Sequence, residues 1–303
     1  MKKILTLLIA AGAIAGCAKE ESSDTPAAVN FTASETALTR ADAAIPVGAK
    51  ANIWAYAKNA DITSATAKVA AKQYEVAAGG AGTLTPSPAG PMYLPKGDYD
   101  FYSVGTFNGT GTIPAVTNGV ASALVNATDY ILAGKQTGTM ANATLNIPFT
   151  YTHAASMVKI TVTADAASTV INSISKVTIT PSDPTGVTLN LGGLTPGISQ
   201  AAAVTTAADM NVETANSVFT YIMLPLAASK DVTFIISANV TLAGQSAADM
   251  TFTGKITTPA GGFKGANRYA YTATVKGSDI TFGTVKVTDW VETASGNIDT
   301  EQQ

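Results

Sequence analysis

The stretch MVKITVT, residues 157–163, decides the fold class, because its apolar and polar residues alternate without a break. Val158, Ile160 and Val162 fall on one side of an extended chain, whereas a lysine and two threonines fall on the other. Alternation of β-branched residues with a period of two is typical of a half-buried β-strand. The sequence therefore predicts a strand here, with one face turned towards a core.

The same alternation returns along most of the chain, and glycine, proline, asparagine and aspartate punctuate it. Helical 3.6-residue patterns are hard to find after residue 30. Short strands separated by turn signals are typical of β-sandwiches, so we expect an all-β fold. The other strands that we expect are Val29–Ala33, Ala51–Tyr56, Asp98–Val104, Lys176–Thr180, Val232–Leu242, Met250–Ile256, Arg268–Val275 and Ile280–Val287.

Two local assignments follow from turn signals and propensity. Met250–Ile256 and Arg268–Val275 flank Pro259-Ala260-Gly261-Gly262, which predicts that these two strands pair. Ala201–Met210 fits a short helix or a loop, and propensity does not decide between them.

The length of 303 residues allows two domains. Residues 105–146 are rich in glycine, threonine, asparagine and alanine, and strong alternation restarts near Pro148. We therefore expect one β-sandwich over residues 41–147 and a second over residues 148–303.

Cys17 is the only cysteine of the chain, and it follows a short export signal. Two lysines, an apolar run and small residues make residues 1–16 a secretory signal, too short to span a bilayer, which needs about 20 apolar residues. Ile14-Ala15-Gly16-Cys17 resembles the lipobox of bacterial lipoproteins, which implies cleavage between Gly16 and Cys17 and a lipid on Cys17. The alternative is an ordinary secretory signal with an incidental cysteine.

The residues after Cys17 bear on where the lipoprotein goes. No aspartate follows Cys17 directly, so retention in the inner membrane is not expected. Lys19-Glu20-Glu21 resembles signals that carry some lipoproteins to the outer face of the outer membrane. It is equally compatible with a solvated tether that continues into a polar linker.

The sequence holds little that could perform catalysis. His153 is the only histidine and is interpreted as structural, and the single cysteine excludes an internal disulfide. No metal, cofactor or nucleic acid is expected, since ligands are too few and the net charge is only −3. Gly79-Gly80-Ala81-Gly82 predicts a hairpin turn and not a phosphate loop. Scattered carboxylates such as Asp98 and Asp100 single out no hydrolytic pair, so we expect no enzyme.

Three segments, in this order, resemble the fimbrillins, which are subunits of the type V pili of Gram-negative anaerobes. They are LPKGDYDFYSVGTF (residues 94–107), PFTYTHAASMVKITV (148–162) and FKGANRYAYTATVKGSDITFGTVKVTDW (263–290). With the lipobox and Arg40, the resemblance covers most of the chain, although no single motif is highly specific.

The resemblance implies two sandwiches of transthyretin-like (Greek-key) topology and a route to the cell surface as a lipoprotein of the outer membrane. There an arginine-specific protease would cut between Arg40 and Ala41. The first strand would leave, and a strand of another copy or of a related subunit would fill its groove by β-augmentation. The resulting fimbria would support adhesion to a partner on host or bacterial cells.

The leaving strand would be Ala28–Ser34, with Val29, Phe31 and Ala33 on one face. Small residues surround Arg40, which suits an extended, protease-accessible loop. The alternative is an ordinary surface arginine in a tether.

Two segments could be the donor strand that enters a neighbour. Residues 280–287 carry apolar anchors, and Gly283 would allow a bulge or register shift. The tail Val291–Gln303 has few apolar anchors. If the first segment is a core strand instead, the protein could be a tip subunit or a surface lipoprotein that never polymerises. The anchors of the first segment are Ile280, Phe282, Val285 and Val287.

A second function class is a non-polymerising surface lipoprotein that binds a glycan or a host protein. Its binding platform would be a cluster of aromatic residues, although aromatics in an alternating sheet more often fill the core. The candidates are Trp54, Tyr56, Tyr99 and Tyr102.

Overall fold

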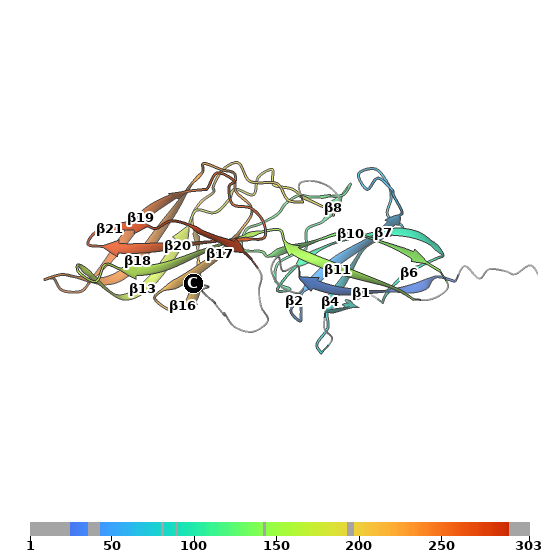
Figure 1. The fold of residues 1–303 in the computed structure, drawn as a ribbon, viewed down its shortest axis with the longest axis horizontal. Coiled ribbons are helices and arrows are strands. Elements are labelled where there is room, and N and C mark those ends of the chain that lie inside the picture. The colour runs from blue at the N-terminus through green and yellow to red at the C-terminus, as the bar shows by residue number, and fades with distance from the viewer. Residues whose placement is uncertain are drawn as a thin grey trace, which may run out of the picture.

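The computed structural model describes residues 25–35, 43–79, 82–88, 90–141, 144–192 and 197–290. Over these residues every regular element is a β-strand, so the all-β prediction is confirmed. No helix in this part of the chain has the length and apolar character needed to cross a bilayer. The molecule is elongated, with one lobe of strands following the other along its long axis (Figure 1).

The N-terminal lobe is one nine-stranded sheet that closes on itself. Its strand order is β11-β10-β7-β3-β4-β5-β1-β2, β6 also pairs with β1, and a further pairing of β1 with β11 closes the ring. Closure leaves neither β11 nor β5 as a free edge. The strands are β1 (Ala27–Glu35), β2 (Ala43–Ala44), β3 (Lys50–Ala57), β4 (Val69–Val76), β5 (Thr83–Pro86), β6 (Met92–Leu94), β7 (Gly97–Thr106), β10 (Tyr130–Met140) and β11 (Leu145–His153).

The central strands of this ring are buried on both faces. In β3, Ile53 and Ala55 point into the ring, whereas Trp54 and Tyr56 join a second cluster outside it. That second cluster also includes Leu124, from the long connection between β7 and β10. This covering explains why the sequence of β3 is apolar on both sides.

The C-terminal lobe is a sandwich of two sheets. One sheet has the order β16-β17-β12-β20-β21, with β22 also on β20, and the other has the order β15-β13-β18-β19. The strands are β12 (Ser156–Ala164), β13 (Thr169–Ile179), β15 (Ala208–Asp209), β16 (Asn211–Thr214), β17 (Val218–Met223), β18 (Asp231–Leu242), β19 (Ala248–Thr257), β20 (Asn267–Lys276), β21 (Asp279–Phe282) and β22 (Lys286–Asp289).

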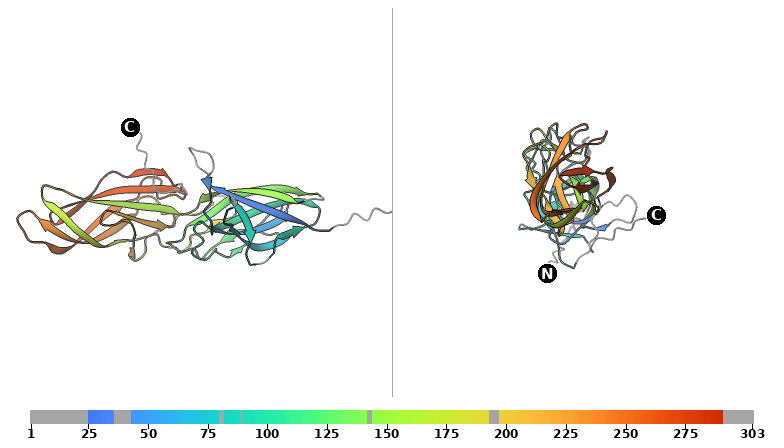
Figure 2. Two further views of the ribbon diagram at one scale, coloured as in Figure 1. Left: turned by 90° about the horizontal axis from the view of Figure 1, so that it is seen from below. Right: turned by 90° about the vertical axis from the view of Figure 1, so that its left-hand side faces the viewer.

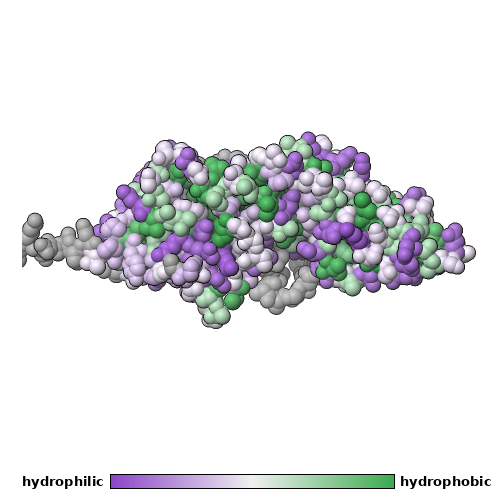
Figure 3. Space-filling view, turned by 180° about the vertical axis from the view of Figure 1, so that it is seen from behind, coloured by the Kyte–Doolittle hydropathy of each residue, from purple (hydrophilic) through white to green (hydrophobic). Residues whose placement is uncertain are grey.

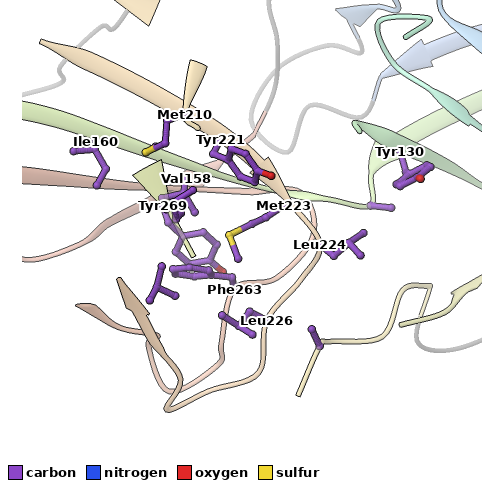
Figure 4. Packing of buried hydrophobic residues seen from close by; sticks show 14 of the residues in the cluster. Tyr130, Val158, Ile160, Met210, Tyr221, Met223, Leu224, Leu226, Phe263 and Tyr269 are labelled. Carbon is purple, nitrogen blue, oxygen red and sulfur yellow. The ribbon is translucent and has the colours of Figure 1, made fainter. Parts of the chain in front are cut away.

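The alternation in residues 157–163 does what the sequence predicts. Val158, Ile160 and Val162 of β12 are buried and share one core cluster with residues of β13, β18 and β19 in the opposite sheet. Figure 4 shows part of this core, where Val158 and Ile160 lie near Tyr221, Met223 and Tyr269. Tyr130 of the N-terminal lobe belongs to the same cluster.

The lobes are also joined by a small sheet of three short strands, β8 (Val116–Thr117), β9 (Val120–Ala121) and β14 (Leu189–Asn190). Figure 2 shows the two lobes end to end from a second direction. The chain passes from one lobe to the other between His153 and Ser156. The division predicted between residues 147 and 148 falls inside β11, which is a strand of the N-terminal sheet. The domain limits are not confirmed and stay a prediction.

One predicted pairing is wrong. β19 pairs with β18, whereas β20 pairs with β12, so these two strands lie in different sheets of the sandwich. Residues 258–266 therefore cross between sheets instead of forming a hairpin turn. Residues 201–210 contain no helix, only loop and the short strand β15. The strands β4 and β5, which flank Gly79–Gly82, do pair antiparallel, as a hairpin requires.

Candidate functional site: the groove of strand β1

Strand β1 lies in the middle of a sheet although it is the first strand of the chain. It pairs parallel with β11, from Val29 opposite Leu145 to Glu35 opposite Tyr151. On its other side it pairs antiparallel with β6 and β5. Figure 1 shows blue β1 alongside green β11. β1 thus fills a groove whose two walls are strands far along the sequence.

The inward face of β1 supplies the centre of the core. Val29 and Phe31 are each 1% exposed, and Ala33 is 6% exposed. The ring of Phe31 lies 5.0 Å from that of Tyr74 and 5.8 Å from those of Phe101 and Phe149, measured between centroids. Aromatic groups at these separations attract beyond the effect of burial alone. Phe31 is therefore the main apolar anchor of β1.

The outward face of β1 is polar and bonds weakly to β11. Asn30 and Asn146 share a side-chain hydrogen bond of 3.2 Å, and Ser34 reaches Thr150 at 3.4 Å. Thr32, between them, is exposed. Side-chain selectivity in this groove consequently comes from the inward positions.

Gly82 lets the hairpin between β4 and β5 approach β1 closely. Its carbonyl accepts a 2.7 Å hydrogen bond from the backbone N–H of Ala33. Its φ of +70° is in the left-handed region, and a Cβ atom there would lie 1.9 Å from the carbonyl oxygen of Ala33. Only glycine satisfies both conditions.

A buried ionic cluster closes the far end of the groove. Glu35, the last inward residue of β1, is 1% exposed. Its carboxylate lies 3.0 Å from Nε2 of His153, while the carboxylate of Asp129 lies 2.7 Å from Nδ1 of the same ring. Both ring nitrogens donate in the imidazolium form, so the geometry fits a protonated histidine between two carboxylates.

The two carboxylates keep His153 charged. Burial by itself lowers the pKa of His153, but the hydrogen bonds and charges of Asp129 and Glu35 outweigh it and raise that pKa to about 9. Paired in this way, a charged ring can stay in a site from which water is excluded.

Aromatic rings cover the faces of this imidazole. Trp290 stacks on His153 at 4.1 Å with an interplanar angle of 6°, and Phe107 lies 4.7 Å away. Trp290 directly follows β22, and its backbone N–H donates to the carbonyl of Ala266 at 2.9 Å. The cluster therefore joins the end of β1 to the end of β22.

Chemically, the cluster is a buried salt bridge. Both nitrogens of His153 are occupied by carboxylates, which leaves none for a metal ion. Among the residues that the structure describes, no group of three or more histidine, cysteine or acidic side chains is placed to hold a metal ion.

The structure places only some of the residues that the sequence singles out. Val29, Phe31 and Ala33 line the groove from β1. Gly16, Cys17, Arg40 and Ala41 lie outside the described residues, as does the tail 291–303. The lipidation and cleavage predictions therefore stay predictions.

The first donor candidate forms two short strands on one edge of β20. β21 contains Ile280 and Phe282, both half-buried, and Phe282 lies 5.4 Å from the ring of Phe234. Gly283 separates β21 from β22, where Val287 is 47% exposed. Val285, between the two strands, is half-buried. This segment pairs in the sheet but is only partly anchored in the core.

The aromatic residues considered for a glycan platform are core residues. Trp54, Tyr56, Tyr99 and Tyr102 are each 4–6% exposed. On the face in Figure 3, apolar residues are interspersed among polar ones. These four aromatics consequently offer no ligand surface.

Two residues of the site, Glu35 and Asp129, are not predicted from the sequence. Glu35 continues the period-2 face of Phe31 and Ala33, and this continuation is the available signal. Asp129 carries no such signal, because it reaches His153 only through the pairing of β10 with β11.

Comparison with known proteins points to one family. The profile of a family described as fimbrillin-like matches residues 39–290. No curated protein sequence matches the chain significantly.

Three solved structures share the fold. One is a proposed cell adhesion protein from Bacteroides uniformis ATCC 8492, with 20% identity, a TM-score of 0.59, and coverage of 87% of this chain and 98% of the other. Another is from Bacteroides ovatus ATCC 8483, with 17% identity, a TM-score of 0.56, and coverage of 88% and 98%. The third is from Bacteroides fragilis NCTC 9343, with 16% identity, a TM-score of 0.53, and coverage of 89% and 100%.

Proposed function

The chain belongs to the fimbrillin-like family, and from that premise we propose that it is a structural subunit of a cell-surface fimbria. The subunit is exported as a lipoprotein, cleaved after Arg40 and assembled by donor-strand exchange. Its partners are other copies of itself or related pilus subunits, and the fimbria supports adhesion.

One observation carries the proposal: β1 is the closing strand of the N-terminal ring and immediately precedes the segment that contains Arg40. A cut after Arg40 would separate β1 from every other strand of its sheet. Backbone hydrogen bonds and side-chain burial alone would then hold it in place. This arrangement supports a role for β1 as a strand that another chain can replace.

Loss of β1 would leave unpaired backbone groups and exposed apolar side chains, which another strand could cover. The edges of β11 and β5 would expose unpaired N–H and C=O groups, and the rings of Tyr74, Phe101 and Phe149 would face water. A strand from a neighbouring subunit can satisfy the backbone groups and fill the pockets. Uncleaved chains, whose grooves are full, should remain monomers.

Attachment to the outer membrane before maturation is assigned to Cys17. Stable anchoring needs more than one acyl chain, which the diacylglycerol on a lipoprotein cysteine would supply. Cleavage after Arg40 would then separate the lipid and β1 from the subunit together.

No described feature favours the alternative of a glycan- or host-binding lipoprotein that does not polymerise. Its four candidate aromatics are buried. The matching family is described as fimbrillin-like, and a structural relative is described as a cell adhesion protein.

The test is cleavage by an arginine-specific protease, followed by size-exclusion chromatography. Wild-type chain should lose its N-terminal segment and then form oligomers, whereas Arg40→Ala should stay intact and monomeric. Arg268→Lys is the matched control, because Arg268 is the only other arginine and lies in β20 between two paired strands. Removal of that arginine should leave cleavage and assembly unchanged. Cleaved wild-type chain that remains monomeric at high concentration would contradict the proposal.

A further inference from the structure

The end of the β1 groove contains a cation that β1 helps to neutralise. His153 sits on β11, a wall of the groove, and is buried. Asp129, which bonds Nδ1 at 2.7 Å, precedes β10 and remains with the lobe whatever happens to β1. Glu35, which bonds Nε2 at 3.0 Å, belongs to β1 itself.

Departure of β1 would therefore remove one of the two carboxylates. Nε2 would then face the emptied position of Glu35 from a buried site. Water could reach Nε2 in the emptied groove, but a strand that refilled the groove would exclude it again. A buried ion pair that lacks one partner is strongly unfavourable, because the other charge is then kept from water. A strand that restores only the apolar contacts would leave this nitrogen without its acceptor.

We propose that the groove selects an incoming strand with a carboxylate at the place of Glu35, and that Asp289 of a second copy supplies it. This proposal rests on the proposed function, since it assumes that β1 is replaced. It adds a charged specificity pocket, made by His153, to a groove that is otherwise apolar.

The spacing around Asp289 repeats the spacing of β1. In β1, Phe31 and Ala33 precede Glu35 at intervals of two residues, and all three are buried. Val285 and Val287 precede Asp289 at the same intervals. A strand in the direction of β1 that placed Asp289 against His153 would thus put two valines into the pockets of Phe31 and Ala33.

The residues before Val285 extend this match. Ile280 and Phe282 alternate in the same way, but they are out of step with Val285 by one residue. A bulge at Gly283, where β21 already breaks from β22, would bring both into the groove. The whole segment could then supply an apolar anchor for each inward position of β1 before Glu35.

The other carboxylates near the C-terminus lack this pattern. Glu292, Asp299 and Glu301 are not preceded by two apolar residues at intervals of two. The comparison favours residues 280–289 over the tail as the incoming strand.

The present surroundings of β22 agree with a role outside its own lobe. None of its four residues is buried, and Val287 is 47% exposed. Central strands such as β12 and β18 bury alternate side chains, whereas β22, like the edge strand β16, buries none. Insertion into a neighbouring groove would cover Val287 and set Asp289 against the His153 of that neighbour.

The charge state of the pocket supports the choice of a carboxylate. Among the described residues, the titratable groups that face His153 are Glu35 of β1 and Asp129, while Phe107 and Trp290 contact it through uncharged rings. The pKa of His153 is raised to about 9 with both carboxylates present. A strand that brings an amide in place of the acid could still accept a hydrogen bond from Nε2, but it would lose the ion pair with the charged ring.

A displacement experiment tests the pocket directly on the whole chain. The non-lipidated protein is labelled with a fluorophore at Cys17, its only cysteine, and cut after Arg40. A synthetic peptide of residues 279–290, with both ends blocked, is added, and release of the labelled segment is followed by fluorescence anisotropy. Three peptides are compared: the natural sequence, Asp289→Asn, and the control Asp279→Asn, which makes the same charge change at the other end.

We expect Asp289→Asn to need about tenfold more peptide for half-release at pH 7, whereas Asp279→Asn should match the natural peptide. In a chain with His153→Gln, the difference between the natural peptide and the Asp289→Asn peptide should disappear. Because the peptide series uses the wild-type chain, the test holds even if His153→Gln does not fold. Equal potency of the three peptides, or no release by any, would overturn the inference.

The peptide assay and the oligomerisation of cleaved chains together distinguish failure of this inference from failure of the proposed function. Wild-type chains that oligomerise after cleavage, although the peptides do not discriminate, would leave donor-strand exchange in place and remove the charged pocket. Discrimination by the peptides without oligomerisation of cleaved chains would support the pocket and contradict the fimbrial subunit.

Discussion

At the scale of single residues, His153 is the position where sequence and structure complement each other most. From the sequence, this only histidine is interpreted as structural, and the structure shows which residues it contacts. It is a buried imidazolium held by Asp129 and Glu35 and covered by Trp290. Its charge links strand β1 to the body of the lobe.

This charge predicts a pH dependence of stability for the uncleaved chain. The folded pKa of His153, about 9, is above its ordinary value of 6.5. The stabilisation is therefore complete below pH 6.5 and is lost as the pH rises through 9, by up to about 3 kcal/mol. Urea unfolding between pH 6 and 9.5 should show the decline, and His153→Gln should lower stability at pH 6 and flatten the profile. A wild-type profile parallel to that of His153→Gln would contradict this origin.

At the scale of elements, β1 is held by a hairpin that approaches it closely, and two glycines of that hairpin form a matched pair. Gly79 and Gly82 both have positive φ, at +78° and +70°. A Cβ atom at Gly79 would meet nothing within 4 Å, whereas one at Gly82 would collide with the backbone of Ala33.

We therefore expect Gly79→Ala to cost only backbone strain, about 1–2 kcal/mol of unfolding free energy. Gly82→Ala should cost more, and after cleavage at Arg40 it should release β1 faster. Denaturant unfolding and the release of the Cys17-labelled segment measure the two effects. Equal losses for both variants would show that the contact with Ala33 does not hold β1.

A substitution in β22 can test assembly of the cleaved chain without a large change in the stability of the monomer. Val287 is 47% exposed, so Val287→Asp should change the unfolding free energy of the monomer by no more than about 0.5 kcal/mol. It should nevertheless block oligomerisation of the cleaved chain, because a carboxylate would have to enter an apolar pocket. Lys286→Asp, on the other side of the strand, is the control and should assemble.

Deletion of residues 291–303 addresses the competing donor in the same chromatographic assay. Loss of assembly on deletion, together with normal assembly of Val287→Asp, would assign the donor strand to the tail.

At the scale of the whole molecule, the two lobes share a core. Leu124 and Tyr130 of the N-terminal half belong to one hydrophobic cluster with Val158, Leu224 and other residues of the C-terminal sandwich. The small sheet of β8, β9 and β14 adds backbone pairing between the halves. The groove of β1 belongs to a separate cluster, which includes Phe31, Tyr74 and Phe101, so the shared core joins the lobes without including the groove.

The route of the whole molecule to the cell surface gives a prediction at Cys17. Cys17→Ala should abolish incorporation of labelled fatty acid, because the thiol that accepts the diacylglycerol is gone. The non-lipidated chain should still fold, since Cys17 precedes the first strand of the ring. Labelling that persists in the variant would remove the lipoprotein assignment.

The sequence by itself determined which residues face a core. The side-chain period of two in an extended chain is local, so the inward faces of β1 and β12 could be predicted from a few neighbouring residues each. Composition and turn signals likewise sufficed for the all-β class.

Only the tertiary structure decided which strands pair and which polar groups meet. β1 lies against β11, and β19 and β20 lie in different sheets, because pairing depends on long-range packing that period-2 alternation does not encode. Asp129, Glu35 and His153 come together only when the ring closes. Their charges are tolerated in the interior because closure brings opposite charges within hydrogen-bonding distance as it removes water.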